Sequence, residues 1–401
     1  MTAAVDIDIR EQAAQRFGQL GWPTPRLEAW KYTNLAPVQR TVWKRATQPI
    51  SAPLAEGRVR GAFAEYVFVN GIYAPDLSTP RSELQLTDEQ RARHFARYAD
   101  YENHAMTALN TANAQDGAML RIDGAIDGFI HLLFIGTDGY ESHPRNLIVA
   151  GRGAQATIVE SYTGTGRYFT NAVTEIVAGD GAVIDHTKLE SESRDAYHVG
   201  LVHVHQDRAS SVTSRSFAVG GALVRNETSA ALTGEGASLV LDGLFVATGT
   251  QHVDNHTVID HAKPHCESIE LYKGILDESA RGIFDGTIIV REGAVKTVSR
   301  QTNNNLLLSE SAIVDSKPTL VIHNDDVKCN HGSTIGQIQE EPMFYLRSRG
   351  IGEEEARSLL VYAFAGELVD RIKTEPVREQ VRRAMFTHMP GRLPERRGAA
   401  R

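Results

Sequence analysis

The sequence predicts a mainly β protein whose long strand-rich core lies between two helical terminal regions. Three observations support this prediction. Short apolar or alternating runs follow one another from 116 to 335, helical periodicity marks the segments on either side, and no helical pattern interrupts the core. We therefore expect a mostly helical N-terminal region over 1–115, a β core over 116–335 and a helical C-terminal region over 336–401.

The N-terminal region is expected to be mostly helical, with one small sheet element. The segment "DIREQAAQRFGQL" carries a helical pattern that we expect to end at Gly18, and a second helical run begins at Thr87 and Asp88, which are suitable N-cap residues. Between them, "AEYVFVNGIYAPDL" predicts a strand pair that turns at Asn70 and Gly71.

The segment from 116 to 335 is predicted to be entirely β. Runs such as "HLLFIG", "ATIVESY" and "GTIIVREG" recur at intervals of roughly 8 to 15 residues, between glycines and polar turns. The lack of helical segments excludes a doubly wound sheet and leaves a sandwich, a barrel or a β-helix. About 220 residues is large for a sandwich. We find no strict hexapeptide period, so the pattern permits a β-helix without requiring it.

The C-terminal region returns to helix. One helix is expected at "EEPMFYLRSRG", with Pro342 near its start and Gly350 at its end, and a second has Glu353 to Glu355 in its first turn. The apolar stripe that we predict on the second helix consists of Ala356, Leu359, Leu360, Ala363, Phe364, Val369 and Ile372. This stripe either packs on the rest of the chain or serves a partner. The tail, 390–401, is expected to be disordered.

Composition limits the classes of partner and the cellular setting. The 401 residues carry a formal net charge of −8, which argues against nucleic acid or an anionic membrane surface as the main partner. The start of the chain lacks the pattern of a signal peptide, and no run of about 18 uncharged apolar residues is present. Two cysteines, Cys266 and Cys329, cannot form a disulfide framework. We expect a cytoplasmic protein.

The short segment "DDVKCNHG", 325–332, is the best candidate site. If it is extended, alternation places Val327, Cys329 and His331 on one face, with Cys329 and His331 about 6.6 Å apart along the strand. This spacing suits two ligands that reach towards one iron or a small cluster, whereas a Cys–His nucleophile pair needs hydrogen-bond contact. The alternative is a buried thiol and a hydrogen-bonded histidine with structural roles only.

A complete iron–sulfur site needs more ligands than this segment offers. Such sites normally take four thiolates, or two thiolates and two imidazoles. The second cysteine, Cys266, lies in a separate segment, so Cys329 and His331 form at most part of a site. We therefore expect any cluster to be shared with a partner subunit and to be labile, which suits building and transfer.

A second group of candidate ligands lies in "HVDNHTVIDHAKPHCES". Its members are His252, His256, His261, His265 and Cys266. Pro264 and the β-branched residues argue against a helix, and strand alternation would send His265 and Cys266 to opposite faces, so a structural role is favoured. Likewise, His203 and His205 share a strand face and are interpreted as ordinary polar positions.

Two common catalytic motifs are absent from the sequence. The chain has no Gly-Lys dipeptide and hence no Walker loop, so any nucleotide-driven step belongs to another protein. It also has no G-x-S-x-G nucleophile elbow.

The segment "DDVKCNHGSTIG", followed by "FYLRSRGI" and "EEEARSLLVYAFAGEL", resembles the C-terminal signature of the SufB and SufD family of iron–sulfur cluster assembly proteins. Other stretches agree, among them "GWPTPRLEAWKYTNL", "YKGILDESARGIFDGTIIV" and "NNNLLLSESAIVDSKP", so the resemblance covers nearly the whole chain. Within the family it is closer to SufD-type chains, because SufB-type chains read H-E-A-T where this chain reads H-G-S-T from His331. Ser333 and Asn324 depart from the alanines that are more usual there.

The resemblance implies a right-handed parallel β-helix core between helical terminal regions. It also implies that this core pairs with SufB and that a nascent cluster forms at the interface, with His331 and Cys329 as the residues of this chain. The C-terminal helical region is implied to dock the ATPase SufC. The candidate docking residues are Phe344, Tyr345, Leu346, Arg349, Leu359, Leu360 and Phe364.

The role implied by the resemblance is that of a scaffold in the bacterial cytoplasm and not that of an enzyme. The expected cofactor is a transient iron–sulfur cluster shared with the partner, and no nucleotide is expected to bind this chain. Homodimerisation of the isolated chain is left open. Two other functions are weighed: a mononuclear metalloenzyme built on the histidines from His252 to His265, and a β-helix enzyme that acts on polysaccharide.

Overall fold

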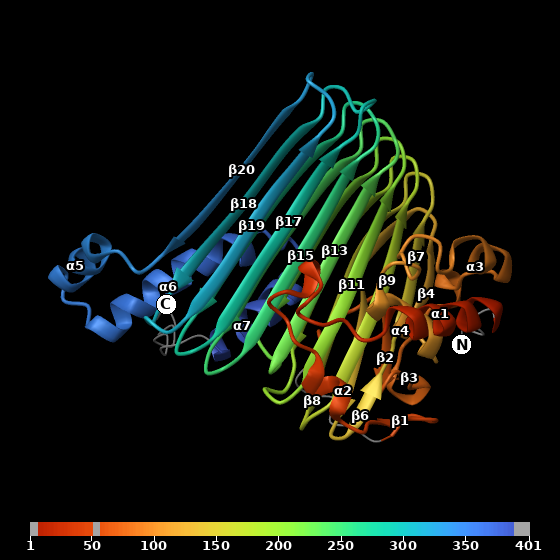
Figure 1. Ribbon diagram of the computed structural model, residues 1–401, viewed down its shortest axis with the longest axis horizontal. Coiled ribbons are helices and arrows are strands. Elements are labelled where there is room, and N and C mark those ends of the chain that lie inside the picture. The colour runs from red at the N-terminus through yellow and green to blue at the C-terminus, as the bar shows by residue number, and fades with distance from the viewer. Residues whose placement is uncertain (1–6, 51–56, 389–401) are drawn as a thin grey trace, which may run out of the picture.

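The structure, a computed structural model, describes residues 7–50 and 57–388, and its main body is a parallel β-helix (Figure 1). Successive long strands of the core alternate between two sheets, so each coil adds one strand to each sheet. Of the three architectures that the strand pattern permits, the β-helix is the one observed. The tail that we predict to be disordered, 390–401, lies outside the described residues.

The two sheets are called sheet A and sheet B. The main path of sheet A runs through β1 (Lys44–Arg45), β6 (Tyr140–Ser142), β9 (Phe169–Ala178), β11 (Tyr197–Gln206), β13 (Leu223–Leu232), β15 (His252–His261), β17 (Arg281–Val290) and β19 (Ile313–Ile322). Beside this path, β9 also pairs with β7 (Arg145–Ala150), which pairs with β4 (Met119–Ile122).

Sheet B contains the other strands. Its order is β20 (Lys328–Gly336), β18 (Val298–Leu307), β16 (Glu267–Leu276), β14 (Ser238–Ala247), β12 (Ser211–Ala218), β10 (Val183–Ser191), β8 (Gln155–Thr165), β5 (Ala125–Thr137), β2 (Ala64–Val69) and β3 (Ile72–Tyr73). Its neighbouring strands are parallel, apart from the antiparallel pair β2 and β3.

The coils differ in length. Tyr197 pairs with Leu223 in the next coil, 26 positions later, whereas Arg281 pairs with Ile313, 32 positions later. A parallel β-helix needs the strands of neighbouring coils to stay in register, but the turns between them can vary. This variation explains why the sequence shows no short fixed period.

Apolar side chains fill most of the space between the two sheets. In β14, for example, Leu239 and Leu241 are each 1% exposed and belong to the same buried cluster as Ile259 of β15 and Phe284 of β17. Cys266 also lies in this interior cluster. Burial of alternate residues on each strand holds successive coils together.

The outer face of sheet B is covered by C-terminal helices. These are α5 (Glu340–Ser348), α6 (Glu353–Val369) and α7 (Glu375–His388), of which α6 and α7 pack on the sheet whereas α5 projects from the body (Figure 1). Val361 and Leu368 of α6 join Leu244 of β14 and Leu271 of β16 in one apolar cluster. An ion pair of 2.8 Å between Arg371, which lies just after α6, and the buried Asp242 of β14 holds the end of the helix on the sheet.

The buried side of α6 differs from the predicted stripe. Ala356, Val369 and Ile372 are buried as expected, but Leu359, Leu360 and Phe364 are only half-buried and Ala363 is exposed. Their place is taken by Val361, Ala365 and Leu368. The predicted stripe is therefore wrong in part: it lies on a face of α6 that is rotated from the buried face. The error arises because both sides of this helix carry apolar residues. The helix α7 was not predicted.

The N-terminal region begins with α1 (Ile7–Leu20), which continues through Gly18. The prediction that Gly18 ends this helix is wrong. Instead Gly21, with φ of 68°, follows the last turn, and its amide donates to the carbonyl of Phe17 at 2.7 Å. A glycine just beyond the helix adopts this left-handed conformation without the steric cost of a Cβ atom.

The other N-terminal predictions are largely confirmed. Thr87 caps α3 (Asp88–His94) in a capping box with Gln90, although the helical pattern then divides and resumes only at α4 (Ala105–Asn113). Asn70 and Gly71, both with positive φ, form the predicted turn between β2 and β3. Shorter helical elements are η1 (Glu28–Trp30), α2 (Ala36–Arg40), η2 (Pro75–Leu77) and η3 (Ser82–Leu84).

A segment around η1 crosses the outer face of sheet A. The Trp30 ring lies 3.8 Å from the Arg225 guanidinium of β13, and the Tyr32 ring lies 5.3 Å from that of Arg281 on β17. Within the described ranges, no helix is long and apolar enough to cross a membrane.

Candidate functional site

The last coil of the β-helix is not covered by another coil. Among the described residues, β19 and β20 end the two sheets, each paired with one neighbouring strand only (Figure 1). Their other edges carry free backbone donors and acceptors, together with the exposed apolar side chains Ile313, Val321, Ile322 and Ile335. We call these two strands and the side chains around them the open end. An exposed edge of this kind is a template for pairing with another chain.

Cys329 and His331 lie on β20 at the open end, and both face inward. Cys329 packs against the interior apolar cluster. Two positions beyond His331, the Ser333 hydroxyl lies 2.8 Å from the Ser316 hydroxyl of β19, across the interior. Because β20 stays in register with β18 from Lys328 to Gly336, His331 shares the face of its neighbours at 329 and 333. The structure thus places both predicted site residues on one face.

The two side chains differ in their access to solvent. Cys329 is half-buried and His331 is exposed, since no further coil lies above them. Burial raises the pKa of the Cys329 thiol, partly opposed by a hydrogen bond from the backbone of Ser299. The thiol is therefore protonated in the free chain, and binding of a metal to its sulfur would release that proton to solvent.

The candidate docking residues form two groups. On α5, Phe344 and Tyr345 are 73% and 57% exposed, and the Arg349 guanidinium lies over the Tyr345 ring. Leu346 of α5 is half-buried, as are Leu359, Leu360 and Phe364 of α6. The Phe364 ring lies 4.6 Å from the Lys273 ammonium group of β16, so this residue also fixes α6 to sheet B.

The structure does not bring the second group of histidines together. His252 and His256 face outward, where their imidazoles lie 2.8 Å from the Thr33 hydroxyl and 2.9 Å from the Asp254 carboxylate. His261 faces inward, and its Nε2 lies 2.9 Å from the Ser268 hydroxyl. His265 lies in the following turn, with φ of 59°. These positions favour separate structural roles, as do the contacts of His203 and His205 with the ring of Tyr98.

Comparison with known proteins decides the family. Residues 134–364 match the family model described as "SUF system FeS cluster assembly, SufBD core domain". The chain belongs to the SufBD family. The iron–sulfur cluster assembly protein SufD of Escherichia coli (strain K12) is 33% identical over 95% of this chain and 93% of its own length. The resemblance to SufD-type chains is thereby confirmed.

Two further relatives span nearly the whole chain as well. An iron–sulfur cluster assembly SufBD family protein of Synechocystis is 32% identical over 94% of this chain and 90% of its own length. Protein ABCI7, chloroplastic, of Arabidopsis thaliana is 27% identical over 96% of this chain and 86% of its own length. The similarity therefore includes the N-terminal and C-terminal regions as well as the β-helix.

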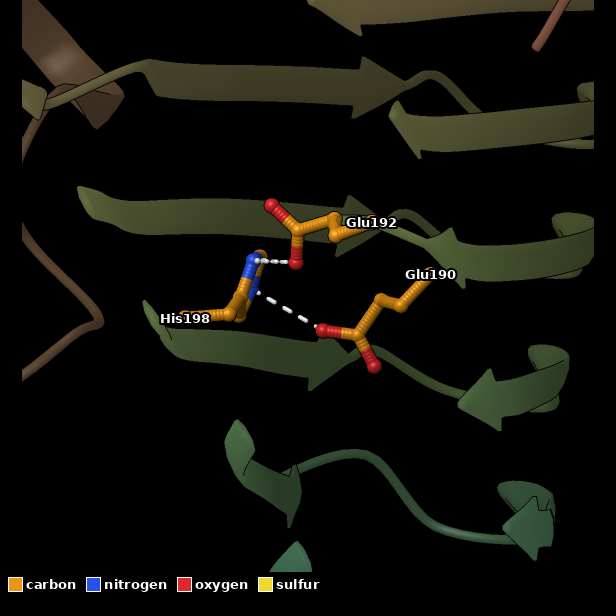
Figure 2. A group of neighbouring side chains, drawn as sticks. All are labelled: Glu190, Glu192 and His198. Carbon is orange, nitrogen blue, oxygen red and sulfur yellow. Dashed lines mark ion pairs between the residues drawn. The ribbon is translucent and has the colours of Figure 1, made fainter. Parts of the chain in front are cut away.

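Inside the β-helix of this SufD-type chain, sequence analysis missed a buried cluster of ionisable residues formed by Lys188, Glu190, Glu192 and His198. Figure 2 shows Glu190, Glu192 and His198 of this cluster. The two ring nitrogens of His198 lie 3.0 Å from a Glu190 oxygen and 3.0 Å from a Glu192 oxygen. Charges at 186, 188, 190 and 192 alternate with other residues in "DHTKLESES", which is the pattern of a solvated strand face. That pattern does not reveal that these side chains are buried, because alternation alone does not show which face of a strand points into the β-helix.

Glu190, Glu192 and His198 are metal-ligand types within ligand distance of one another. The Lys188 ammonium group, however, lies 2.9 Å from Glu190, 3.0 Å from His198 and 2.6 Å from the Asn226 amide oxygen. This group therefore occupies the place that a metal ion would take among these ligands. Burial raises the pKa of Glu192 to about 8 and lowers that of His198 to about 3, so at neutral pH both are uncharged. The remaining contact, between the Lys188 ammonium group and the Glu190 carboxylate, is a buried ion pair.

Proposed function

We propose that this chain is a non-catalytic scaffold subunit that pairs with SufB through the open end and shares a nascent iron–sulfur cluster with it. One observation carries the proposal: Cys329 and His331 face inward on the last strand of a β-helix whose end is uncovered. A second β-helix that closes this end would bury both side chains and bring the ligands that this chain lacks. The cluster is then cargo of the complex.

The geometry supports pairing through strands. The free edges of β19 and β20 can continue each sheet into a partner, and the exposed isoleucines and valine there would be buried by it. The Cys329 thiol is protonated in the free chain and would meet iron and sulfur only after this chain has paired with SufB. Access of solvent to Cys329 and His331 would then depend on whether the two subunits are paired.

The C-terminal helices are the surface that we propose for the ATPase SufC. Phe344 and Tyr345 are large, exposed and adjacent on α5, which projects away from the β-helix (Figure 1). Aromatic side chains beside an arginine are frequent anchors of protein interfaces. We include Leu346, Arg349, Leu359, Leu360 and Phe364 in the same surface. ATP would bind SufC and not this chain, and the whole complex would work in the cytoplasm.

The cluster role is tested by His331→Ala in the complex with SufB and SufC. The three proteins are co-expressed and purified without oxygen, and the visible absorption of the iron–sulfur chromophore is compared with wild type. We expect at least a tenfold loss, because a single ligand of a shared site is removed. Asn330→Ala is the matched control, since Asn330 is the exposed neighbour on the opposite face of β20. Wild-type absorption from His331→Ala would refute the role.

The docking role is tested by Leu360→Glu in a pull-down with SufC. A buried charge at an interface costs several kcal/mol, so we expect binding to fall at least tenfold. The control is Gln19→Glu, which adds the same charge on exposed α1, at the other end of the molecule from α5 (Figure 1). Undiminished capture of SufC by Leu360→Glu, with the fold retained, would remove α6 from the docking surface.

A further inference from the structure

The interior of the β-helix changes character close to the open end. In β14 the inward residues Leu239 and Leu241 are apolar, but six inward residues of the next two strands of sheet B are polar and at most 3% exposed. They are Ser268 and Glu270 on β16, and Ser299, Gln301, Asn303 and Asn305 on β18. Burying polar groups destabilises a fold unless they are hydrogen-bonded, so apolar residues would serve stability better here. Of these polar residues, Ser299 and Gln301 lie directly below Cys329 and His331 in strand register.

Glu270, Gln301 and His331 form one column. Glu270 pairs with Gln301 in strand register, and Gln301 pairs with His331. Neighbouring strands are about 4.8 Å apart, so each side chain of the column lies next to the following one. The column begins at a buried carboxyl group and ends at the exposed imidazole of the proposed cluster site.

The amide of Gln301 is held in one orientation. Its Nε2 donates a hydrogen bond of 2.7 Å to Oε2 of Glu270. On the opposite side, Gly286 of β17 leaves room for this nitrogen, because a Cβ atom there would collide with it. Burial raises the pKa of Glu270 to about 7, so at pH 8 this group is mostly a carboxylate. A carboxylate oxygen can only accept, so the amide then turns its N–H group to Glu270 and its oxygen elsewhere. Within the described part of the chain, Oε1 of Gln301 is buried and has no hydrogen-bond partner.

We propose that Gln301, oriented by Glu270, accepts a hydrogen bond from one ring nitrogen of His331 and thereby leaves the other nitrogen free to bind iron at the open end. The imidazole is the neighbour of Gln301 in the column and can supply the missing donor. A histidine that gives its N–H to a fixed acceptor presents a defined lone pair to a metal. Gln301 and Glu270 are therefore positioning residues.

The inference deepens the proposed function, on which the use of the free nitrogen rests, but the hydrogen bond itself is a property of the isolated chain. It is tested there by NMR of ¹⁵N-labelled histidine at pH 8, where the two neutral tautomers of His331 have different ¹⁵N shifts. The His331 signals are assigned by their loss in His331→Ala. One hydrogen bond changes the ratio of two states by about threefold to tenfold.

We expect Gln301→Leu to change the tautomer ratio of His331 by that factor. Ser299→Ala is the matched control, since Ser299 is an inward residue of the same strand and lies below Cys329. It should leave the ratio unchanged. Thermal unfolding establishes that each variant is folded. If Gln301→Leu does not fold, Glu270→Gln is measured instead, because the amide of Gln301 then loses its fixed orientation and the ratio should move in the same direction.

An unchanged ratio in a folded Gln301→Leu, or in Glu270→Gln where that variant replaces it, overturns the inference. A ratio that shifts as much in Ser299→Ala overturns it as well, because the effect would then be a general one of the interior. A shifted ratio in the Gln301 variant alone supports it, whatever the cluster yield of His331→Ala. That yield decides the proposed function separately.

Discussion

At the scale of single residues, four ionisable side chains come together in the interior of the β-helix. Lys188, Glu190, Glu192 and His198 are all buried, and they hold one another by ion pairs and short polar contacts. Gly200 makes this packing possible, since a Cβ atom there would lie 2.6 Å from the Lys188 nitrogen. The protonation of these groups is therefore linked to the stability of the coil that contains them.

The raised pKa of Glu192 predicts how stability changes with pH. In the folded chain burial raises this pKa from 4.5 to about 8. Between these values the folded chain keeps a proton that the unfolded chain has released, so this contribution is complete below pH 4.5 and is lost as pH rises towards 8. Glu192→Gln cannot titrate. We expect its free energy of unfolding, relative to wild type, to rise by a few kcal/mol, about 1.4 kcal/mol per pH unit at most.

The measurement is urea unfolding of both proteins at pH 5, 6, 7 and 8. Other titrating groups, among them His198 and Glu270, are present in both and largely cancel in the difference. Parallel stability curves over this range would mean that Glu192 is ionised in the folded interior, and the prediction would then be wrong.

The shared face of the two candidate site residues was predictable, but their surroundings were not. Alternation alone placed Cys329 and His331 on one face, because a strand has a period of two whatever it packs against. Gln301, by contrast, stands in "RQTNNNLL", a polar run that is typical of an exposed strand. Its burial depends on the coil stacked above it and on Gly286 across the interior, which no local pattern contains.

At the scale of the elements, the end of a helix depends on the backbone conformation of the residue after its last turn as much as on the periodicity of its apolar residues. Gly18 and Gly21 both follow the apolar pattern of α1, and the sequence does not distinguish them by composition. Only Gly21 has a positive φ, and Gly18 lies inside the helix. Similarly, α6 carries apolar residues on two sides, so its buried face is set by the sheet below it.

The two glycines provide a matched pair of substitutions. Gly18→Ala should stabilise the protein by about 0.5–1 kcal/mol, because alanine restricts the unfolded chain and there is open space around Gly18. Gly21→Ala should destabilise it by roughly 1–2 kcal/mol, since the left-handed conformation strains a residue with a Cβ atom. Thermal and urea unfolding measure both. Equal effects of the two substitutions would contradict this assignment of the helix end.

At the scale of the whole molecule, the two ends of the β-helix are unlike. The N-terminal region covers the first coils, whereas the last coil leaves β19 and β20 uncovered (Figure 1). The short strands and the absence of intervening helices could be predicted from the strand pattern. The β-helix was predicted only through the family resemblance and is confirmed, because coils of 26 to 32 residues show no fixed repeat from which it could be read. The open end could not be predicted from sequence patterns either, because it depends on the absence of a further coil beside β19 and β20.

The open end predicts self-association of the isolated chain. Without SufB, a second copy is the available partner for the free edges, and we expect a concentration-dependent homodimer in sedimentation equilibrium. Ile335→Lys should weaken it at least tenfold, because it places a charge among the apolar residues of the open end. Ile269→Lys is the control, since Ile269 is equally exposed, at 51% against 50%, but lies within sheet B. Dimerisation that survives Ile335→Lys would place the contact elsewhere.

The order of the coils has a consequence for how the protein is made. Each coil is built on the one before it, and the strand with Cys329 and His331 is the last to be synthesised and the last to be added. A nascent or misfolded chain therefore has no surface on which these two side chains can be arranged. Under the proposed function, iron would be offered these ligands only by a chain whose preceding coils have already formed, so the position of β20 would act as a check on the maturity of the β-helix.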